Sequence, residues 1–165
     1  MAGANISRMA DESTGVSALD QRIPFLLSQL GAHVADGFKN RLAPLGIQPR
    51  ATAVLLALAD TDGQSQRELS ARLGLHRNVM VSLIDALEAE GLVERRTHPE
   101  DRRAFAVSLT DEARGLLPEL DRVGRELEDD VTAALSDDER ATLLRALQRL
   151  SATAGLIPGV HPGLA

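Results

Sequence analysis

The 165-residue sequence has no cysteine, no tryptophan and no tyrosine, and it has only three phenylalanines. Without a thiol the chain cannot form a disulfide, a thiolate zinc site or a thiol-based redox sensor. A ligand pocket in this protein also has no indole or phenol group to use. The four histidines show no paired spacing, so we expect no metal site; they are His33, His76, His98 and His161.

Long hydrophobic runs are also missing, since no stretch approaches the roughly 20 apolar residues that span a membrane. The start of the chain has no apolar segment behind a basic one, so we expect no secretory signal and a cytoplasmic location. Hydrophobic residues make up 44% and charged residues 25% of the chain, which is typical of a globular protein. We therefore expect one domain with additional helices and no membrane partner.

The common motifs of catalysis are absent as well. The sequence has no GxSxG, no HExxH, no phosphate-binding glycine loop and no cysteine nucleophile. Asp129 and Asp130 are adjacent in an expected helix, so their carboxylates point apart and do not form an acid–base pair. We therefore expect a protein that is not an enzyme and that needs no cofactor.

Charge is distributed unevenly along the chain. The net charge of −6 argues against a nucleic-acid partner only if the acidic residues are spread evenly. They are instead concentrated in the C-terminal third, where we interpret most of them as solvated helix faces. Basic residues gather in one short stretch, at Arg95, Arg96, Arg102 and Arg103.

That basic stretch lies inside the segment 65–110, which has the pattern of two helices followed by two strands. Ser65 and Glu68 have the spacing of a capping box, which predicts a helix from residue 66, and Gly74 suits the left-handed turn that ends it. The next helix ends at Gly91. Its inward residues are Val79, Leu83, Ile84 and Leu87, and its outward residues are His76, Arg77, Asn78, Val81, Ser82 and Asp85.

Two strands are predicted after this helix, over residues 92–96 and 104–109. The loop 97–103 between them is too polar for a core and too long for a tight hairpin, so we expect it to project as a wing. Together these elements predict a winged helix-turn-helix.

Further helices are predicted on both sides of the segment. Apolar residues at three- and four-residue spacing predict a first helix over 19–42, ended by Pro44 and Gly46, and Pro49 opens a second helix. Thr110 caps a fifth helix that Pro118 should bend. Ser136 and Glu139 form a capping box at the start of a sixth.

The predicted fold is therefore mainly α with a small β-wing. We divide the chain into a mobile tail (1–17), a dimerisation helix (18–46), a winged helix-turn-helix domain (47–110), dimerisation helices (111–154) and a C-terminal tail without regular structure (155–165). The flanking helices carry more apolar surface than one winged module can cover, which favours a two-fold dimer. The alternative is that they fold back on their own module. Gly31 and Gly37 mark close approaches of another group or are merely tolerated in the first helix.

In the order of its elements the chain resembles the MarR family of bacterial transcriptional regulators, over about residues 19–150. The family's wing motif, D-x-R followed after five residues by L-T, appears as Asp101, Arg102, Arg103, AFAVS, Leu109 and Thr110. The helix-turn-helix text LSARLGLHRNVMVSLIDALEAEGLVERR is also similar. The resemblance implies a roughly triangular homodimer that binds a pseudo-palindromic operator on double-stranded DNA, and hence a nucleoid-associated protein.

On this interpretation each recognition helix enters a major groove and each wing reaches an adjacent minor groove. Arg77 and Asn78 are the candidates for base edges, with phosphate contact as the alternative, and Val81 suits a thymine methyl group. Arg103 suits the narrow minor groove and Asp101 can hold its guanidinium, although the two are alternatively an ordinary ion pair. We assign Arg95, Arg96 and Arg102 to phosphates, and Ser82 completes the predicted DNA-binding set.

The recognition helix departs from the family pattern at several positions. His76, a poor capping residue, stands where a serine is common, and Glu90 replaces a frequent arginine. Val81 and Ser82 stand where a hydroxyl residue followed by arginine is frequent. Fewer positive charges predict weaker attraction to the DNA backbone and an atypical operator.

The resemblance also implies a small aromatic or phenolic anion as effector, bound between the dimerisation helices and the winged module. A carboxylate needs a cation in a largely apolar pocket, and the candidates are His33, Phe38, Arg50 and Met80. Each has a plainer alternative, since Phe38 can belong to the core and Met80 can fill a gap in it. We expect a ligand-responsive repressor, with an activator as the variant and a winged-helix protein-docking module as the alternative.

Overall fold

The computed structural model describes residues 15–97 and 105–164. The chain divides into two compact units, residues 1–36 and 37–165, and each is described by itself. The boundary falls within one helix, so the first unit contains that helix's opening turns and the second contains its last ones.

The first unit contains two helices where the sequence pattern predicts one. The segment 19–42 is divided into α1 (Ser17–Asp20) and α2 (Ile23–Leu42). Pro24 explains the break, because its ring would clash with the carbonyl of Asp20 in a continuous helix and it has no N–H to donate. The unit leaves its apolar side chains exposed, namely Val16, Leu19, Ile23, Phe25, Leu27 and Leu30.

The last turns of α2 pack closely on α6 (Asp111–Val131), a helix of the same unit. A Cβ on Gly37 would lie 3.1 Å from Leu127 Cδ1, so this glycine marks a close approach. Arg41 secures the same contact by donating to the Gly37 carbonyl (3.2 Å) and pairing with Asp130. Gly31 has open space around it and is simply tolerated.

After α2 the chain makes one 3₁₀ turn (Ala43–Leu45), and Gly46 takes the left-handed conformation that ends it. Three helices of the winged module follow, α3 (Pro49–Asp60), α4 (Gln66–Leu73) and α5 (Arg77–Ala89). The predicted capping box is present, with Ser65 and Glu68 bonded to each other's backbone N–H. Gly74 has the predicted positive φ (64°) in the turn between α4 and α5.

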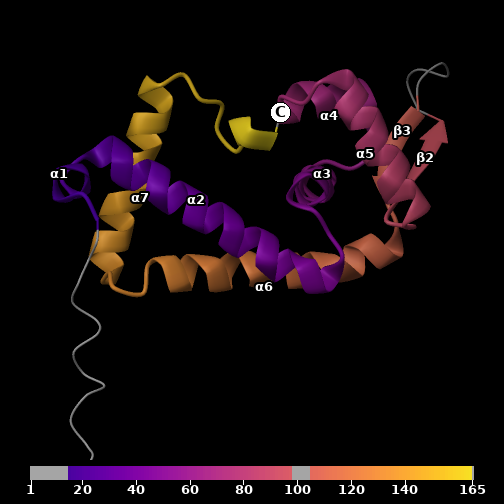
Figure 1. The fold of residues 1–165 in the computed structure, drawn as a ribbon. Helices are drawn as coiled ribbons and strands as arrows, with labels where there is room; N and C mark the ends of the chain where they lie inside the picture. Colours follow the sequence, from indigo (N-terminus) through magenta and orange to yellow (C-terminus); the bar gives the residue numbers. More distant parts are fainter. Residues whose placement is uncertain (1–14, 98–104, 165) are drawn as a thin grey trace, which may run out of the picture. The chain divides into compact units, whose positions relative to one another are not determined.

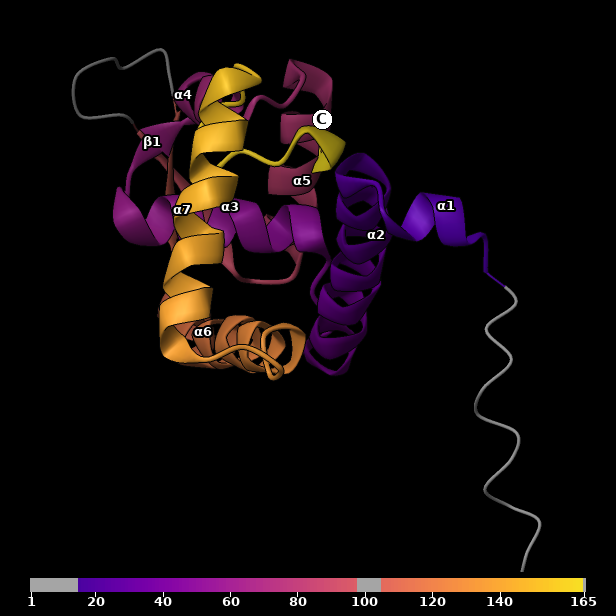
Figure 2. The same ribbon diagram turned by 90° about the vertical axis from the view of Figure 1, so that its left-hand side faces the viewer.

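The wing sheet has three antiparallel strands in the order β1-β3-β2, where the sequence predicts two strands. The predicted pair is present as β2 (Val93–Thr97) and β3 (Phe105–Leu109). The additional strand, β1 (Gln64–Ser65), pairs with Val107 and Ala106 of β3. A two-residue strand has no alternation to read, so only its distant partner reveals it. Figure 2 shows β1 at the edge of the module beside α4.

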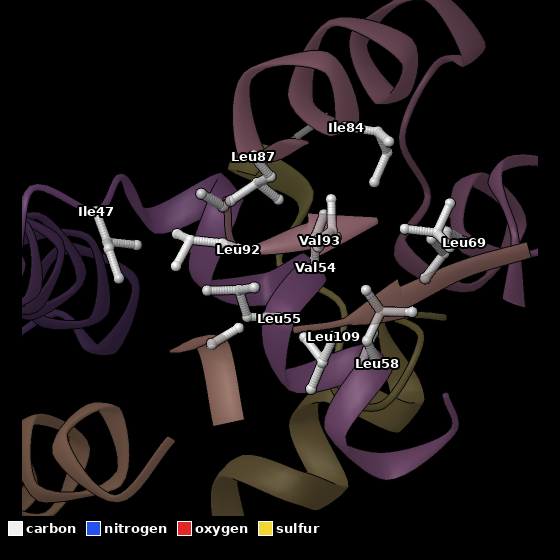
Figure 3. Packing of buried hydrophobic residues seen from close by; sticks show 14 of the residues in the cluster. Ile47, Val54, Leu55, Leu58, Leu69, Ile84, Leu87, Leu92, Val93 and Leu109 are labelled. Atoms are coloured by element: carbon white, nitrogen blue, oxygen red, sulfur yellow. The ribbon is translucent and has the colours of Figure 1, made fainter. Parts of the chain in front are cut away.

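The core of the second unit is built around α3, which contacts α4, α5, α6 and β3. Figure 3 shows Val54, Leu55 and Leu58 of α3 surrounded by side chains from the other elements. These three leave no exposed surface, and neither do Leu69, Met80 and Ile84. Burying each such side chain contributes about 1.5–3 kcal/mol, so the winged module has its own apolar core.

Polar contacts at the C-terminal end of α3 connect it to the wing. The carboxylate of Asp62 accepts from the backbone N–H of Leu109 (3.0 Å), beyond the last β1–β3 pair, and also holds Arg114 of α6. Arg72 of α4 donates to the Ala57 carbonyl (3.0 Å) and pairs with Asp60. These groups satisfy carbonyls and N–H groups that the helix and strand ends leave open.

The C-terminal helices begin as the sequence predicts. Thr110 caps α6 by accepting from Ala113, and α6 continues through Pro118, which cannot donate to the Arg114 carbonyl. Ser136 and Glu139 form the capping box of α7 (Asp137–Thr153). The expectation that 155–165 lacks regular structure is wrong at one place, because Pro162–Leu164 form a 3₁₀ turn.

Among the described residues, no single helix is both long and apolar enough to cross a membrane. One bent pair, Ile23–Leu45 with Pro49–Asp60, passes by length and composition only.

We predict that Asp62→Ala lowers the free energy of unfolding by about 1–2 kcal/mol, because the Leu109 N–H and Arg114 both lose their acceptor. Urea denaturation followed by circular dichroism measures this loss. Asp121→Ala is the control, since it breaks only an exposed pair with Arg125 on α6 and should cost less than about 0.5 kcal/mol. Equal losses in the two variants would contradict the bracing role of Asp62.

Candidate nucleic-acid interface

The outer face of α5 presents a stripe of polar side chains. Asn78, Ser82 and Asp85 are spaced four and three residues apart and are exposed, so they lie along one side of the helix. Arg77 is exposed at the first position of α5 and makes no ion pair or hydrogen bond with any described residue. Val81 is half-buried beside them.

His76 caps α5 in spite of being an uncommon capping residue. Its backbone is extended (φ −63°, ψ 143°), and its Nδ1 accepts from the backbone N–H of Asn78 at 3.3 Å. The imidazole thus accepts the capping hydrogen bond that a serine commonly accepts in this family. The expectation of a poorly capped helix is therefore wrong. The cap fixes the first turn of α5, where Arg77 and Asn78 are located.

Arg95 of β2 is held against α5. Its guanidinium pairs with Asp85 and Glu88, and its backbone N–H donates to Glu88 Oε1 at 3.2 Å. With its amide oriented to suit the donors, Gln66 of α4 accepts from Arg95 Nη2 (2.8 Å) and Nε (3.1 Å). The Arg95 side chain is only 20% exposed, and this single residue joins β2, α5 and α4.

Partial burial lowers the pKa of Arg95, but the hydrogen bonds that it donates to Asp85 and Glu88, together with their negative charges, outweigh burial, so the pKa is raised. The guanidinium in turn offsets part of the negative charge of Asp85 and Glu88 on the outer side of α5. Arg95 therefore does not offer the free guanidinium that a phosphate contact needs. Arg96, in contrast, is largely exposed and pairs with Glu94 of its own strand.

The wing residues with the most specific sequence motif, Asp101, Arg102 and Arg103, lie outside the described residues. The strands on either side of them are described, and Thr97 is paired with Phe105 at the outer end of the sheet. Figure 1 shows β2 and β3 beside α5, so the two strands at the base of the wing adjoin α5, which is the recognition helix predicted from the sequence.

The four effector candidates occupy different surroundings. His33 is exposed on α2 in the first unit. In the second unit, Phe38 is half-buried against the core and Arg50 is exposed in the first turn of α3. Met80 is completely buried in the core, where it fills space between helices. The described residues contain no cluster of three or more metal-ligating side chains.

Two features of this site were missed in the sequence. Arg95 pairs with residues seven and ten positions before it, across the turn between α5 and β2. These spacings differ from the three and four residues that reveal ion pairs along one helix. The tie of Asp62 to the end of β3 crosses 47 residues. For the Arg95 pairing, the signal available in the sequence was an arginine in the strand that follows a helix with two carboxylates on its outer side.

Comparison with known proteins agrees with this geometry. Residues 45–104 match the family model described as MarR family. The repressor CouR, in a structure with a 23-mer DNA duplex, is 31% identical; the match covers 83% of this chain and 97% of that one, with a TM-score of 0.73. The chain belongs to the MarR family. Its members are DNA-binding winged helix-turn-helix transcriptional regulators rather than enzymes, as the sequence resemblance implies.

Other relatives cover less of the chain or are more distant. Wild-type MarR from E. coli, in its apo form, is 25% identical over 78% of this chain and 96% of that one, with a TM-score of 0.69. CouR from Rhodococcus jostii, bound to p-coumaroyl-CoA, is 30% identical over 82% and 96%, with a TM-score of 0.69. A transcriptional regulatory protein for the hcr operon of Thauera aromatica is 32% identical over 105 residues, and the match spans 63% of its length.

We predict that Arg95→Ala weakens DNA binding about tenfold because two carboxylates on α5 are left to repel phosphates. Fluorescence anisotropy with labelled DNA at fixed salt measures the change. Adding Asp85→Asn and Glu88→Gln to Arg95→Ala should restore most of the affinity. A triple variant as weak as Arg95→Ala would instead make Arg95 a direct phosphate contact.

Proposed function

We propose that this MarR-family chain acts as a homodimeric repressor that binds a pseudo-palindromic operator and is released by a small aromatic anion. The observation that supports DNA reading most directly is the first turn of α5. It is capped by His76, and the side chains of Arg77 and Asn78 are exposed there without a hydrogen-bond or ion-pair partner among the described residues. The CouR structure with a DNA duplex shows that a relative with this fold binds DNA.

The exposed face of α5 has the groups that read base edges in a major groove. A guanidinium at Arg77 can donate two hydrogen bonds to a guanine, and the amide of Asn78 can pair with an adenine. Val81 is half-buried and offers only part of its side chain to a thymine methyl group. Ser82 is exposed, although its hydroxyl donates to the Asn78 carbonyl at 3.1 Å.

Phosphate contacts come from a smaller set than the sequence alone suggests. Arg96 remains a candidate because its side chain is 66% exposed and its partner Glu94 lies on the same strand. Arg95 is left out, since Asp85 and Glu88 hold it. Arg102 and Arg103, with Asp101, stay predictions from the wing motif.

The acidic character of the chain is compatible with DNA binding because the charge is unevenly distributed, with many of the acids in the C-terminal third. On α6, Arg122 pairs with Glu119 and Glu126. Such pairs leave the net charge of −6 unchanged, but they determine where on the surface the uncompensated acids lie. On α5 the carboxylates of Asp85 and Glu88 share the single positive charge of Arg95.

A second copy of the chain would cover the apolar surface that one copy leaves exposed. On α7 the side chains of Leu143, Leu144, Leu147 and Leu150 are 36–57% exposed at helical spacing. The first unit exposes another apolar set on α1 and α2, described above. Contiguous apolar faces of this kind mark interfaces, and a two-fold dimer would present two recognition helices to a palindrome.

The effector is proposed by analogy with the p-coumaroyl-CoA bound to CouR. An aromatic acid or its thioester combines a flat apolar ring with negative charge, which suits Phe38 and Arg50 near the start of the second unit. His33 stays a candidate from the sequence. Met80 contributes only if the core opens, because its side chain is fully buried.

We predict that the purified dimer binds DNA from its own upstream region and that Arg77→Ala weakens this binding by about 1–3 kcal/mol. If Arg77 contacts a base, Arg77→Ala should also relax the base preference at one operator position. If Arg77 contacts a phosphate, the substitution should instead reduce the slope of affinity against salt concentration by about one.

Arg103→Ala should weaken DNA binding by at least about 1 kcal/mol and leave the dimer intact, as measured by light scattering. Arg125→Ala on α6 is the control, and no binding at any salt concentration would favour a protein-docking role.

We predict that aromatic carboxylic acids or their CoA thioesters raise the melting temperature, because a ligand bound only by the folded state stabilises it. A thermal-shift series with benzoate, p-coumarate and p-coumaroyl-CoA measures this. A true effector should also lower operator affinity in the anisotropy assay. Acetate and acetyl-CoA are the controls, and equal shifts with them would remove the aromatic requirement.

A further inference from the structure

We propose that Phe105 packs on the deoxyribose face of the DNA strand that separates the major groove under α5 from the minor groove at the wing. This inference rests on the proposed DNA-binding function. It assigns an apolar, sequence-independent contact to a residue that neither the wing motif nor the recognition helix includes.

Phe105 is exposed in a way that its neighbours are not. Its exposed fraction is 61%, and no large apolar residue described between 37 and 164 is more exposed. The other four residues of β3 are buried. Aromatic residues are scarce in this chain, which has three phenylalanines and neither tryptophan nor tyrosine. A single exposed apolar residue is common on protein surfaces, so only the place of this ring in the sheet points to a partner.

The strand register shows which way Phe105 faces. Phe105 pairs with Thr97, and the next pair on the same face is Val107 with Arg95. Arg95 reaches Asp85 on the outer stripe of α5. Phe105 therefore lies on the sheet face that adjoins α5, two ladder pairs beyond the Arg95–Val107 pair and at the outer end of the strands.

This position determines the chemistry of the partner. When α5 lies in a major groove and the wing in the next minor groove, one sugar–phosphate strand passes between them. The C–H surface of its deoxyribose rings is the apolar part of that strand, and Phe105 faces it across the base of the wing. Thr97, exposed beside Phe105, places a hydroxyl next to the adjoining phosphate.

Phe105→Ala should weaken binding about three- to tenfold on operator and on unrelated DNA alike. The salt slope should not change, because an apolar contact releases no counterions. Leu56→Ala is the matched control, since Leu56 is an exposed apolar residue (47%) on α3 that the interface does not use. The melting temperature of both variants should stay close to that of the unaltered chain, because each replaced side chain is exposed.

The absence of tryptophan allows a direct test. Phe105→Trp introduces a single indole, and DNA should quench its fluorescence and shift the emission to shorter wavelength as the ring leaves water. Leu56→Trp, the control, should not respond to DNA. If the fluorescence of Phe105→Trp does not change with DNA, or if Phe105→Ala binds DNA like Leu56→Ala, this proposal is wrong. The proposed function still holds in that case, provided that the unaltered chain binds DNA and Arg77→Ala weakens the binding. Failure of the unaltered chain to bind any DNA overturns both.

Discussion

The position and the surface charge of the recognition helix, α5, depend on the guanidinium of Arg95. Arg95 ties α5 to β2, since its side chain joins Asp85 and Glu88 on the helix while its backbone belongs to the strand. Without it, two carboxylates would lie unpaired on the face that is proposed to approach a polyanion. The same contact therefore connects α5 to β2 and offsets negative charge on α5. A substitution at Arg95 affects both.

Helix caps and turns could be predicted from the sequence because each depends on residues that are close together in the chain. The capping boxes at Ser65 and Ser136 and the turns at Gly74 and Gly91 each involve residues a few positions apart. Pro24 was a readable sign of the break between α1 and α2. The short strand β1 and the tie of Asp62 to Leu109 were not readable, because each depends on a partner more than 40 residues away.

The candidate site shows the same division. Arg77 and Asn78 follow from helical periodicity and are exposed as expected. Arg95 had the right charge for DNA but a different use, because composition and position do not reveal which acids lie opposite a strand. The effector candidates were drawn from a family likeness, and their surroundings differ too much for the chain alone to single one out.

The cap at His76 has a consequence for the chemistry of the helix end. Because Nδ1 accepts a hydrogen bond from Asn78, the neutral ring carries its proton on Nε2. The far side of the imidazole is therefore an N–H donor at the exposed start of α5. A serine at this position would carry its one remaining donor, the hydroxyl hydrogen, on the same oxygen that makes the cap. Histidine performs the same closure and still has a second nitrogen to direct at whatever the helix approaches.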